Sequence, residues 1–481
     1  MNFISLQFLL FFTIIFAGYY FIQHFYFKTK LSEIFLLLAS LVFYGFANIK
    51  FLPFLLFFLL ATYGFSFTVK KNKALFICSI IVIILPLLFF KYINFIISPF
   101  TTQKLTLIFP LGISFITFQC LSYLIDLRKE KIDVEKDPVT VFLFVSFFPV
   151  ISSGPIQMAG VLIPQLKEKH LFNYDSVTNG MKLFAWGFFK KIFIADSLAV
   201  YVNEIYNAPF NHYGIALLTA TIFYSFQIYC DFSGYSDMAI GISNILGFDV
   251  GKNFDHPYLS KSCTEFWKRW HISLSSWLKD YIYIPLGGSR VSAARTYVNL
   301  LITFIVSGMW HGAAKTFIVW GILHGLYQCF ARIFKSFTEK FPDALRIIVT
   351  FCLITFAWIF FRANCLSHAL TIIKKILFIP KEIISIPNMI SETGFIQTVS
   401  TLFSINIKLT EAVNFCFMGL KILLLIVIEL ITFKKPGLEK LKDTSPVLRW
   451  ILYVLLSVFI VTFFLQNSVS SISTNFIYNN F

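Results

Sequence analysis

The stretch VNLLITFIVSGMWHGAAKTFIVWGILHG, residues Val298 to Gly325, carries two histidines within long apolar runs. The run that begins at Val298 leads directly into His311, and a second run begins at Phe317. Apolar runs of this kind predict helices that lie in a membrane. We therefore expect His311 at membrane depth, where a neutral imidazole accepts a proton without carrying a buried charge beforehand.

The rest of the chain has the same character. Hydrophobic residues make up 57% of the 481 residues and charged residues only 13%, a balance that a soluble protein could not bury in one core. A spanning helix needs about 20 mostly apolar residues. We therefore expect an all-α, polytopic membrane protein with roughly a dozen crossings, some of them short or tilted, formed as one domain over residues 1–481. The apolar stretches are Leu6–Phe27, Ile34–Asn48, Phe51–Val69, Ala74–Phe90, Leu105–Ile125, Val139–Ile151, Met181–Val200, Ile215–Cys230, Val298–Trp310, Phe317–Phe330, Ile347–Phe361, Val413–Phe433 and Ile451–Leu465.

The first stretch has neither a basic start nor a small-residue cleavage site, which indicates a retained helix rather than a signal peptide. Eight cysteines are scattered along the chain without CxxC pairs, so neither a disulfide framework nor a metal site is expected.

The net charge of +16 comes from lysines and arginines in short loops rather than from one basic patch, which argues against nucleic acid as a partner. Cytoplasmic loops attract basic residues, and this rule places the N-terminus outside. The basic residues assigned to the cytoplasmic side are Lys28, Lys30, Lys70, Lys71, Lys73, Arg128, Lys129, Lys131, Lys434 and Lys435.

Hydropathy falls between Cys230 and His324, where polar, aromatic and glycine residues crowd together. The polar run from Asp231 to Asp237 implies a water-filled interior, because polar groups are costly in lipid. Its two carboxylates are expected to pair with cations or cap a helix rather than to catalyse a reaction. The stretch 264–285 mixes cations with aromatic rings, which is typical of an interfacial or re-entrant helix.

A second weakly apolar interval, Ile379–Thr410, contains Pro380, Pro387 and Gly394. Prolines favour turns, so the interval is expected to be an extracytoplasmic loop with a short helix.

Three histidines fall in the polar region: His271, His311 and His324. A histidine at membrane depth either serves as a general base or forms a hydrogen bond between helices, and position alone does not separate these two roles.

Long motifs resemble the membrane-bound O-acyltransferase superfamily, and within it the alginate and peptidoglycan O-acetylation branch more than the D-alanyl branch. The likeness rests on YCDFSGYSDMAIGISNILGFDVGKNFDHPYLSKSCTEFWKRWHISLSSWLKDYIYIPLGGSR at Tyr229–Arg290 and SGMWHGAAKTFIVWGILHG at 307–325. Upstream, FPLGISFITFQCLSYLIDLRK at Phe109–Lys129 and FFPVISSGPIQ at Phe147–Gln157 are similar to the same branch. The region 229–324 is thus expected to be the catalytic core.

The resemblance implies a funnel of tilted helices, with re-entrant or interfacial helices, around a central tunnel. The donor would enter from the cytoplasm and the acceptor would approach from outside. His311 matches the family's catalytic histidine and would act as general base on a hydroxyl, with Trp310 beside it as a substrate contact. His271 matches a second characteristic position, for which positioning or donor contact is expected, with a structural role as the alternative. For His324 a packing role is expected.

Lys268, Arg269 and Lys279 surround His271 in the sequence and are candidates to bind the phosphates of an acyl-coenzyme A. The alternative for each is an ordinary cation at the membrane interface, and this is the favoured reading for any one of them alone.

The chain ends Phe476, Ile477, Tyr478, Asn479, Asn480, Phe481, a pattern F-x-Y-x-x-F within the expected extracytoplasmic tail 466–481. It resembles an acyl-carrier motif of envelope acylation systems. A phenol of pKa about 10 is a better leaving group than an alkyl alcohol, so an acyl-tyrosine at Tyr478 stays activated for a second transfer. The alternative is an aromatic anchor at the interface.

These observations lead to one function and several alternatives. Acetyl from acetyl-coenzyme A would pass with the help of His311 to Tyr478, and then to a separate extracytoplasmic transferase of the SGNH type that acetylates peptidoglycan. An alginate-like exopolysaccharide and D-alanylation of teichoic acid are alternative end points. A non-enzymatic transporter or flippase and a lipid acyltransferase are the competing classes. The chain is placed in the bacterial inner membrane.

Overall fold

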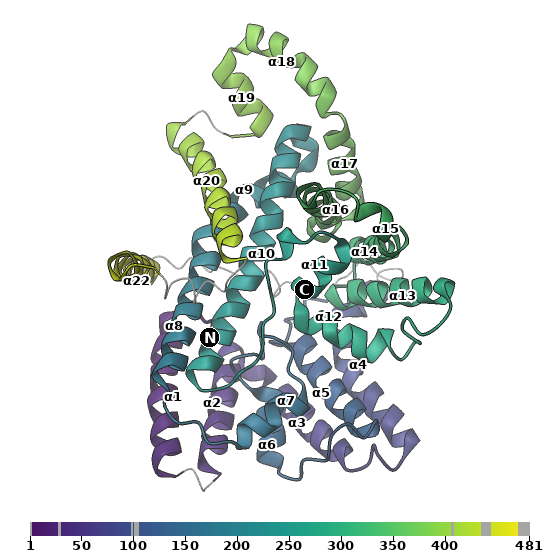
Figure 1. The fold of residues 1–481 in the computed structure, drawn as a ribbon, viewed down its shortest axis with the longest axis vertical. Helices are drawn as coiled ribbons and strands as arrows, with labels where there is room; N and C mark the ends of the chain where they lie inside the picture. The colour runs from purple at the N-terminus through teal and green to yellow at the C-terminus, as the bar shows by residue number, and fades with distance from the viewer. Residues whose placement is uncertain are drawn as a thin grey trace.

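The computed structural model describes residues 2–26, 30–97, 100, 105–405, 408–433 and 444–469, and these residues form helices and connecting segments without a β-strand (Figure 1). The helices are α1 (Leu6–Phe25), α2 (Leu31–Ala47), η1 (Ile49–Phe51), α3 (Leu52–Ser66), α4 (Lys73–Ile97), α5 (Ile113–Arg128), α6 (Pro138–Ser146), α7 (Ala159–Lys167), α8 (Tyr174–Phe189), η2 (Lys190–Ala195), α9 (Asp196–Asn207), η3 (Pro209–Asn211), α10 (Gly214–Ile245), η4 (Pro257–Leu259), α11 (Cys263–Arg269), α12 (Ile272–Leu278), η5 (Lys279–Tyr283), α13 (Ala293–His311), α14 (Lys315–Ile333), α15 (Lys335–Thr338), α16 (Asp343–Arg362), α17 (Leu366–Leu377), α18 (Ile379–Thr393), α19 (Phe395–Phe403), α20 (Leu409–Thr432) and α22 (Pro446–Val469).

Each predicted apolar stretch coincides with helical structure, but fewer helices than predicted are long and apolar enough to span a membrane. Within the described residues seven reach that length and hydropathy. They are Leu6–Phe25, Ile49–Ser66, Lys73–Ile97, Gly214–Ile245, Asp343–Arg362, Thr410–Thr432 and Pro446–Phe463. Several of the other stretches form shorter helices, so the number of crossings stays a prediction. The nine residues of α6 rise only about 14 Å, less than half of a bilayer core of about 30 Å.

The central helix α10 is longer than predicted, with 32 residues that are buried over most of their length. It packs along α8 at very short range (Figure 1). A Cβ on Gly187 would lie 2.4 Å from the carbonyl oxygen of Gly234, and a Cβ on Gly234 would lie 2.7 Å from that of Gly187. Small residues that allow two backbones to approach are typical of helix packing in membranes.

The polar run of α10 is paired with cations rather than lining the cavity described below. The carboxylate of Asp231 lies 2.5 Å from Lys191 Nζ, and that of Asp237 lies 2.7 Å from Lys190 Nζ. Both lysines belong to the π-helical turn η2. Pairing with cations was predicted correctly, although the partners come from η2 and not from the cations of 268–279. The expectation that this run lines a water-filled interior stays a prediction.

Between Cys263 and Tyr283 the chain forms two seven-residue helices, α11 and α12, and the π-helical turn η5. Each is too short to cross a bilayer, as expected for an interfacial or re-entrant segment. The interval after Ile379 differs from its prediction, because it forms two helices, α18 and α19, which arch away from the body (Figure 1). Pro380 lies in the first turn of α18, where its missing N–H costs nothing, but Pro387 lies inside that helix rather than in a turn.

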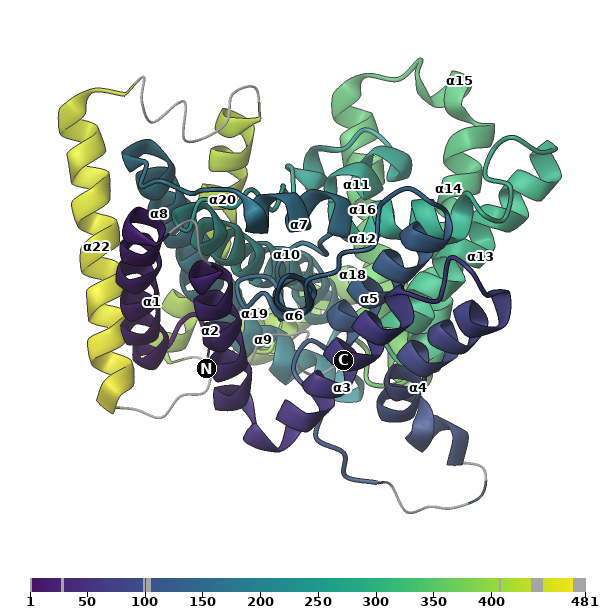
Figure 2. The ribbon, with the colours of Figure 1, turned by 90° about the horizontal axis from the view of Figure 1, so that it is seen from below.

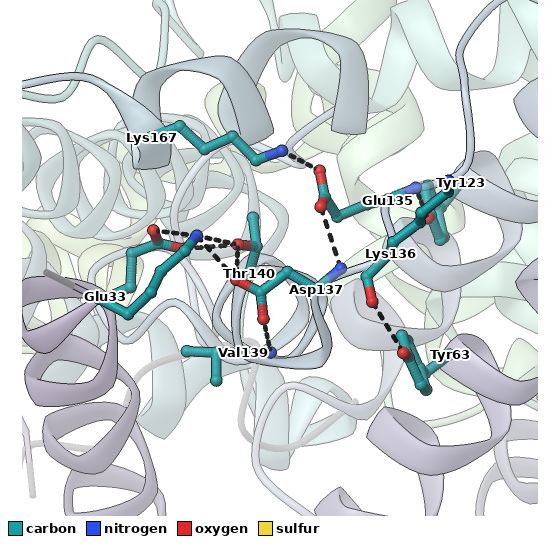
Figure 3. A network of polar contacts seen from close by, with 10 residues as sticks. Glu33, Tyr63, Tyr123, Glu135, Lys136, Asp137, Val139, Thr140 and Lys167 are labelled. Atoms are coloured by element: carbon teal, nitrogen blue, oxygen red, sulfur yellow. Dashed lines mark hydrogen bonds and ion pairs between the residues drawn. The ribbon is translucent and has the colours of Figure 1, made fainter.

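The basic loops near α2, α3 and α6 meet at one end of the bundle, where they form the polar network of Figure 3. Lys30 Nζ lies 2.7 Å from carboxylate oxygens of both Glu33 and Asp137. Arg128 donates to the carbonyl oxygen of Lys70 at 2.6 Å. Burial alone would raise the pKa of Asp137, but hydrogen bonds from Lys30 and the Val139 N–H outweigh it and hold that pKa below its ordinary value. The described basic loops thus share one end, as the topology prediction requires.

The last described helix, α22, lies at the edge of the molecule beside α1 and α8 (Figure 2). Its contact with the body is a cluster of rings in which Phe463 lies 5.2 Å from Phe188 and Phe459 lies 5.8 Å from Phe193, centroid to centroid.

Candidate active site

A cavity of about 280 Å³ lies between α2, α4, the segment before α5 and the end of α13. His311 and Trp310 form part of its wall. The other lining residues are Tyr44, Ala47, Asn48, Phe51, Lys91, Ile108, Phe109, Pro110, Leu111, Gly112, Ile113, Ser114, Phe115 and Ser152. Among these lining residues there is no carboxylate, and Lys91 is the one lysine.

The cavity lies at the end of the bundle opposite the basic loops. Helix α4 starts at Lys73 beside these loops, and Lys91 is 18 residues further along, a rise of about 27 Å. Helix α2 likewise starts next to Lys30 and reaches the cavity at its other end, with Ala47 and Asn48. If the basic loops face the cytoplasm, the cavity faces the extracytoplasmic side.

The end of α13 is held by close packing against α14. A Cβ on Gly308 would lie 2.3 Å from the carbonyl oxygen of Phe317, and a Cβ on Gly321 would lie 2.4 Å from that of Phe304. The two glycines therefore let the helices touch one turn before His311, which ends α13. This contact fixes the position of the helix end that carries His311.

The three histidines of the polar region come together in an alternating row of rings. Centroid distances are 6.1 Å from His271 to Trp310, 4.8 Å from Trp310 to His311, 5.0 Å from His311 to Trp320 and 4.7 Å from Trp320 to His324. All five side chains are buried. Sequence spacing placed these histidines in one region, and the structure places them in one row with His311 at its centre.

His271 links the short helices to this row. Its backbone has a left-handed φ of 42°, which turns the chain between α11 and α12. Its Nδ1 lies 3.2 Å from Asn253 Oδ1, and because an amide oxygen only accepts, Nδ1 carries the hydrogen. Its Nε2 has no hydrogen-bond partner within the described part of the chain. Burial lowers the pKa of His271 to about 3, so the imidazole is neutral at physiological pH.

His324 joins two helices, since its Nδ1 accepts a hydrogen bond of 3.1 Å from the indole N–H of Trp267 in α11. This contact supports the packing role predicted for His324, which stays a prediction. In the described residues no group of three or more His, Cys, Asp or Glu side chains is arranged to hold a metal ion.

The cations predicted to bind a donor lie apart from the cavity wall. Lys268 and Lys279 are exposed. Arg269 forms an ion pair of 2.8 Å with Glu265 and lies 4.9 Å from the ring centroid of Phe433. The Arg269 guanidinium is thus engaged within the protein, whereas the side chains of Lys268 and Lys279 are exposed to solvent.

The predicted carrier residues Phe476, Tyr478 and Phe481 lie outside the described residues. Lys91 was not identified from the sequence, because the predicted apolar stretch ended at Phe90. The continuation of an apolar pattern to Ile97 was the signal that the lysine lies inside the helix.

Comparison with known proteins gives consistent matches. The model of the MBOAT, membrane-bound O-acyltransferase family matches residues 111–369, which include all three histidines of the row. A peptidoglycan O-acetyltransferase of Helicobacter pylori is 34% identical over 401 residues, 75% of this chain and 76% of the relative. A Pseudomonas aeruginosa protein named "Probable alginate O-acetylase AlgI" is 40% identical over 57% of this chain and 53% of its own length. A teichoic acid D-alanyltransferase of Bacillus subtilis is 27% identical over 54% of this chain and 70% of its own length.

Proposed function

The chain belongs to the membrane-bound O-acyltransferase family, and from this premise we propose that it moves acetyl groups from a cytoplasmic donor to a hydroxyl acceptor in the cavity beside His311. That it is a multi-pass membrane acyltransferase, rather than a non-enzymatic transporter, follows from the family and the seven long apolar helices. The observation that carries the proposal is the place of His311, at the end of a tightly packed helix and in the wall of a cavity remote from the basic loops.

His311 acts as the general base on the acceptor hydroxyl. A base of this kind contributes a factor of about 10² to 10⁴ to the rate. His271 is a positioning residue, because its ring packs against Trp310 and Phe232 and its Nδ1 is held by Asn253. Trp310, between the two histidines, is a substrate contact.

The donor is acetyl-coenzyme A, whose phosphates bind at Lys268 and Lys279. Both lysines are exposed, and both belong to the segment of short helices between Cys263 and Tyr283. Arg269 supports this surface through Glu265 and is not itself a phosphate ligand.

The acceptor of the first transfer is Tyr478 in the F-x-Y-x-x-F tail, with Phe476 and Phe481 as its aromatic anchors. A separate extracytoplasmic transferase of the SGNH type then takes the acetyl group. Peptidoglycan is the proposed final acceptor, because the H. pylori relative bears that name and aligns over three quarters of both chains. An alginate-like polysaccharide is the second candidate, supported by higher identity over a shorter region.

The membrane is the bacterial inner membrane, the one that faces both cytoplasmic acetyl-coenzyme A and the cell wall. The experiment that tests the function uses the purified chain in lipid nanodiscs with [¹⁴C]acetyl-coenzyme A. We expect label in the C-terminal peptide, and its release when the transferase partner and cell-wall fragments are added. Absence of covalent label with an intact donor would contradict the relay, and label in lysophospholipid would indicate lipid acylation instead.

A further inference from the structure

Lys91 carries a buried amino group within an apolar helix. Its side chain lies in α4, and the residue is only 9% exposed. Its Nζ donates a hydrogen bond of 2.5 Å to the carbonyl oxygen of Trp310 and lies 5.2 Å from the centroid of the Trp310 ring. The residue therefore touches the chain one position before His311.

The ordinary explanation for a lysine near the end of a spanning helix is that its long side chain reaches the membrane surface. A rise of about 27 Å from Lys73 does bring Lys91 close to the far face of a bilayer core of about 30 Å. The side chain nevertheless turns inward, to the end of α13 and the cavity. Among the described residues no carboxylate forms an ion pair with it, so its charge has only a carbonyl dipole and an indole ring for compensation.

A buried, uncompensated ammonium is costly, and intramembrane ionisable residues are usually functional. Part of its role is to complete the helix that bears the base. The last carbonyl groups of an α-helix lack partners within the helix. Tyr92 donates its hydroxyl hydrogen to the carbonyl oxygen of Met309, and Lys91 does the same for Trp310. Two neighbouring residues of α4 thus hold the last turn of α13 and with it His311.

We propose that Lys91 is a further functional residue of the acyl-transfer site, which positions His311 and stabilises the negative charge that forms on the acyl carbonyl oxygen. The inference rests on the proposed function, because it needs acyl transfer in this cavity. An ammonium group has three hydrogens, and only one of them is used by the Trp310 carbonyl. The others are available to a ligand in the cavity that Lys91 lines.

The acceptor hydroxyl gives its proton to the neutral imidazole of His311, and its oxygen forms a bond to the acyl carbon of a thioester. The C=O electron pair moves to the carbonyl oxygen, where Lys91 faces the new negative charge. Collapse restores the C=O bond and breaks the C–S bond, and the leaving sulfur takes the proton from His311 to become a thiol. A positive charge already in place stabilises the oxyanion as its negative charge develops in the transition state, and this raises kcat.

Three substitutions separate charge from helix capping. Lys91→Met removes both the donor and the charge, Lys91→Gln keeps a donor for the Trp310 carbonyl without the charge, and Lys91→Arg keeps both. The measurement is the initial rate at which alkali-labile acetate enters the envelope polysaccharide of cells that lack their own copy of the gene, normalised to membrane-inserted protein. We expect Lys91→Met and Lys91→Gln to lose about 10²- to 10³-fold, as for loss of an oxyanion-stabilising group. Lys91→Arg should recover most of the rate.

Two matched controls come from the same helix. Lys73→Met removes a lysine from the opposite end of α4 and should leave the rate unchanged. Tyr92→Phe removes the neighbouring cap on Met309 without a change in charge, and loss of one hydrogen bond should cost no more than about tenfold.

A second measurement covers the case in which arginine does not fit. Treatment of Lys91→Cys with 2-bromoethylamine rebuilds an ammonium group at nearly the same distance from the backbone. Treatment with a thiosulfonate that transfers a neutral methylthio group adds no charge. Recovery by the first reagent alone supports the charge, with the treated wild type as reference. A Lys91→Gln protein that works at the wild-type rate would overturn the proposal. If the wild type itself restores no acetate, the proposed function fails instead, so the two failures are distinct.

Discussion

Two regions of this molecule bury lysines among membrane helices, and they treat the charge differently. In the region between η2 and α10, Lys190 has Asp237 at 2.7 Å and the hydroxyl of Ser233 at 2.8 Å. At the cavity, Lys91 has the Trp310 carbonyl and no carboxylate among the described residues. Both ammonium groups are almost fully buried, so burial does not distinguish them.

This difference in charge pairing indicates which region stabilises the fold and which region takes part in the reaction. A charge that is paired within the protein is compensated before any ligand binds. Removal of one member of such a pair leaves the other charge unpaired in an apolar interior. A charge at a cavity without a counter-ion is satisfied only when an anionic group is present. Substitutions in the first region should therefore change stability, and those in the second should change the rate.

The largest effect is expected at the centre of the cavity region. His311→Ala removes the proposed base and should lower acetate incorporation by at least about 10²- to 10⁴-fold, while the protein still accumulates in the membrane. The measurement is the amount of alkali-labile acetate in the envelope polysaccharide, normalised to the amount of membrane-inserted protein. His24→Ala, at the exposed end of α1, is the control and should be silent. Near-normal acetate in His311→Ala would mean that the cavity is not the site of transfer.

The next prediction extends the cavity chemistry to the tail. Tyr478→Phe removes only the hydroxyl that would carry the acyl group, and phenylalanine keeps the ring that an interfacial anchor needs. We expect loss of acetyl delivery to the extracytoplasmic partner. Mass spectrometry of the wild-type tail, trapped without the partner, should show one acetyl group on Tyr478. Glycan acetylation that survives in Tyr478→Phe would refute the relay and favour direct transfer from the thioester.

The ion-pair region gives the opposite signature. Lys190→Met leaves the Asp237 carboxylate without its cation, and loss of one partner of a buried pair should destabilise the protein by about 3 kcal/mol or more. Thermal unfolding in detergent measures this loss. The double variant Lys190→Met with Asp237→Leu should regain most of the stability, and the activity per folded molecule should stay near that of the wild type. A catalytic defect without a stability defect would break the proposed division between the two regions.

The smallest effect is expected in the polar network of Figure 3. The pKa of Asp137 is held below its ordinary value of 3.8, so its ionised form stabilises the folded state above that pH. The contribution is lost as pH falls below about 4, because the folded protein must then bind the proton that the unfolded chain already binds. Asp137→Asn should cost less than about 1 kcal/mol at pH 7, and this cost should shrink as pH falls below about 4. A loss of folding stability in Asp137→Asn that does not change with pH would mean that Asp137 acts only as a helix cap.

The amino-acid sequence was enough to predict that lipid surrounds this protein and where its helices lie along the chain. Hydropathy is a property of consecutive residues, so every predicted apolar stretch has a helical counterpart. The end of the stretch at Phe90 was placed wrongly because one lysine lowers local hydropathy regardless of where its side chain points. The motifs likewise identified His271, His311 and His324, since these lie in a continuous pattern of residues.

The tertiary structure alone decided which polar groups meet. Lys91 and the Trp310 carbonyl are separated by 219 positions, and Lys190 and Ser233 by 43. Such partners depend on which helices become neighbours, and that depends on glycine contacts such as Gly187 with Gly234. For the same reason the sequence assigned Asp231 and Asp237 to the wrong cations. Local pattern fixes the secondary structure of each segment, but compensation of a buried charge is a property of two segments packed together.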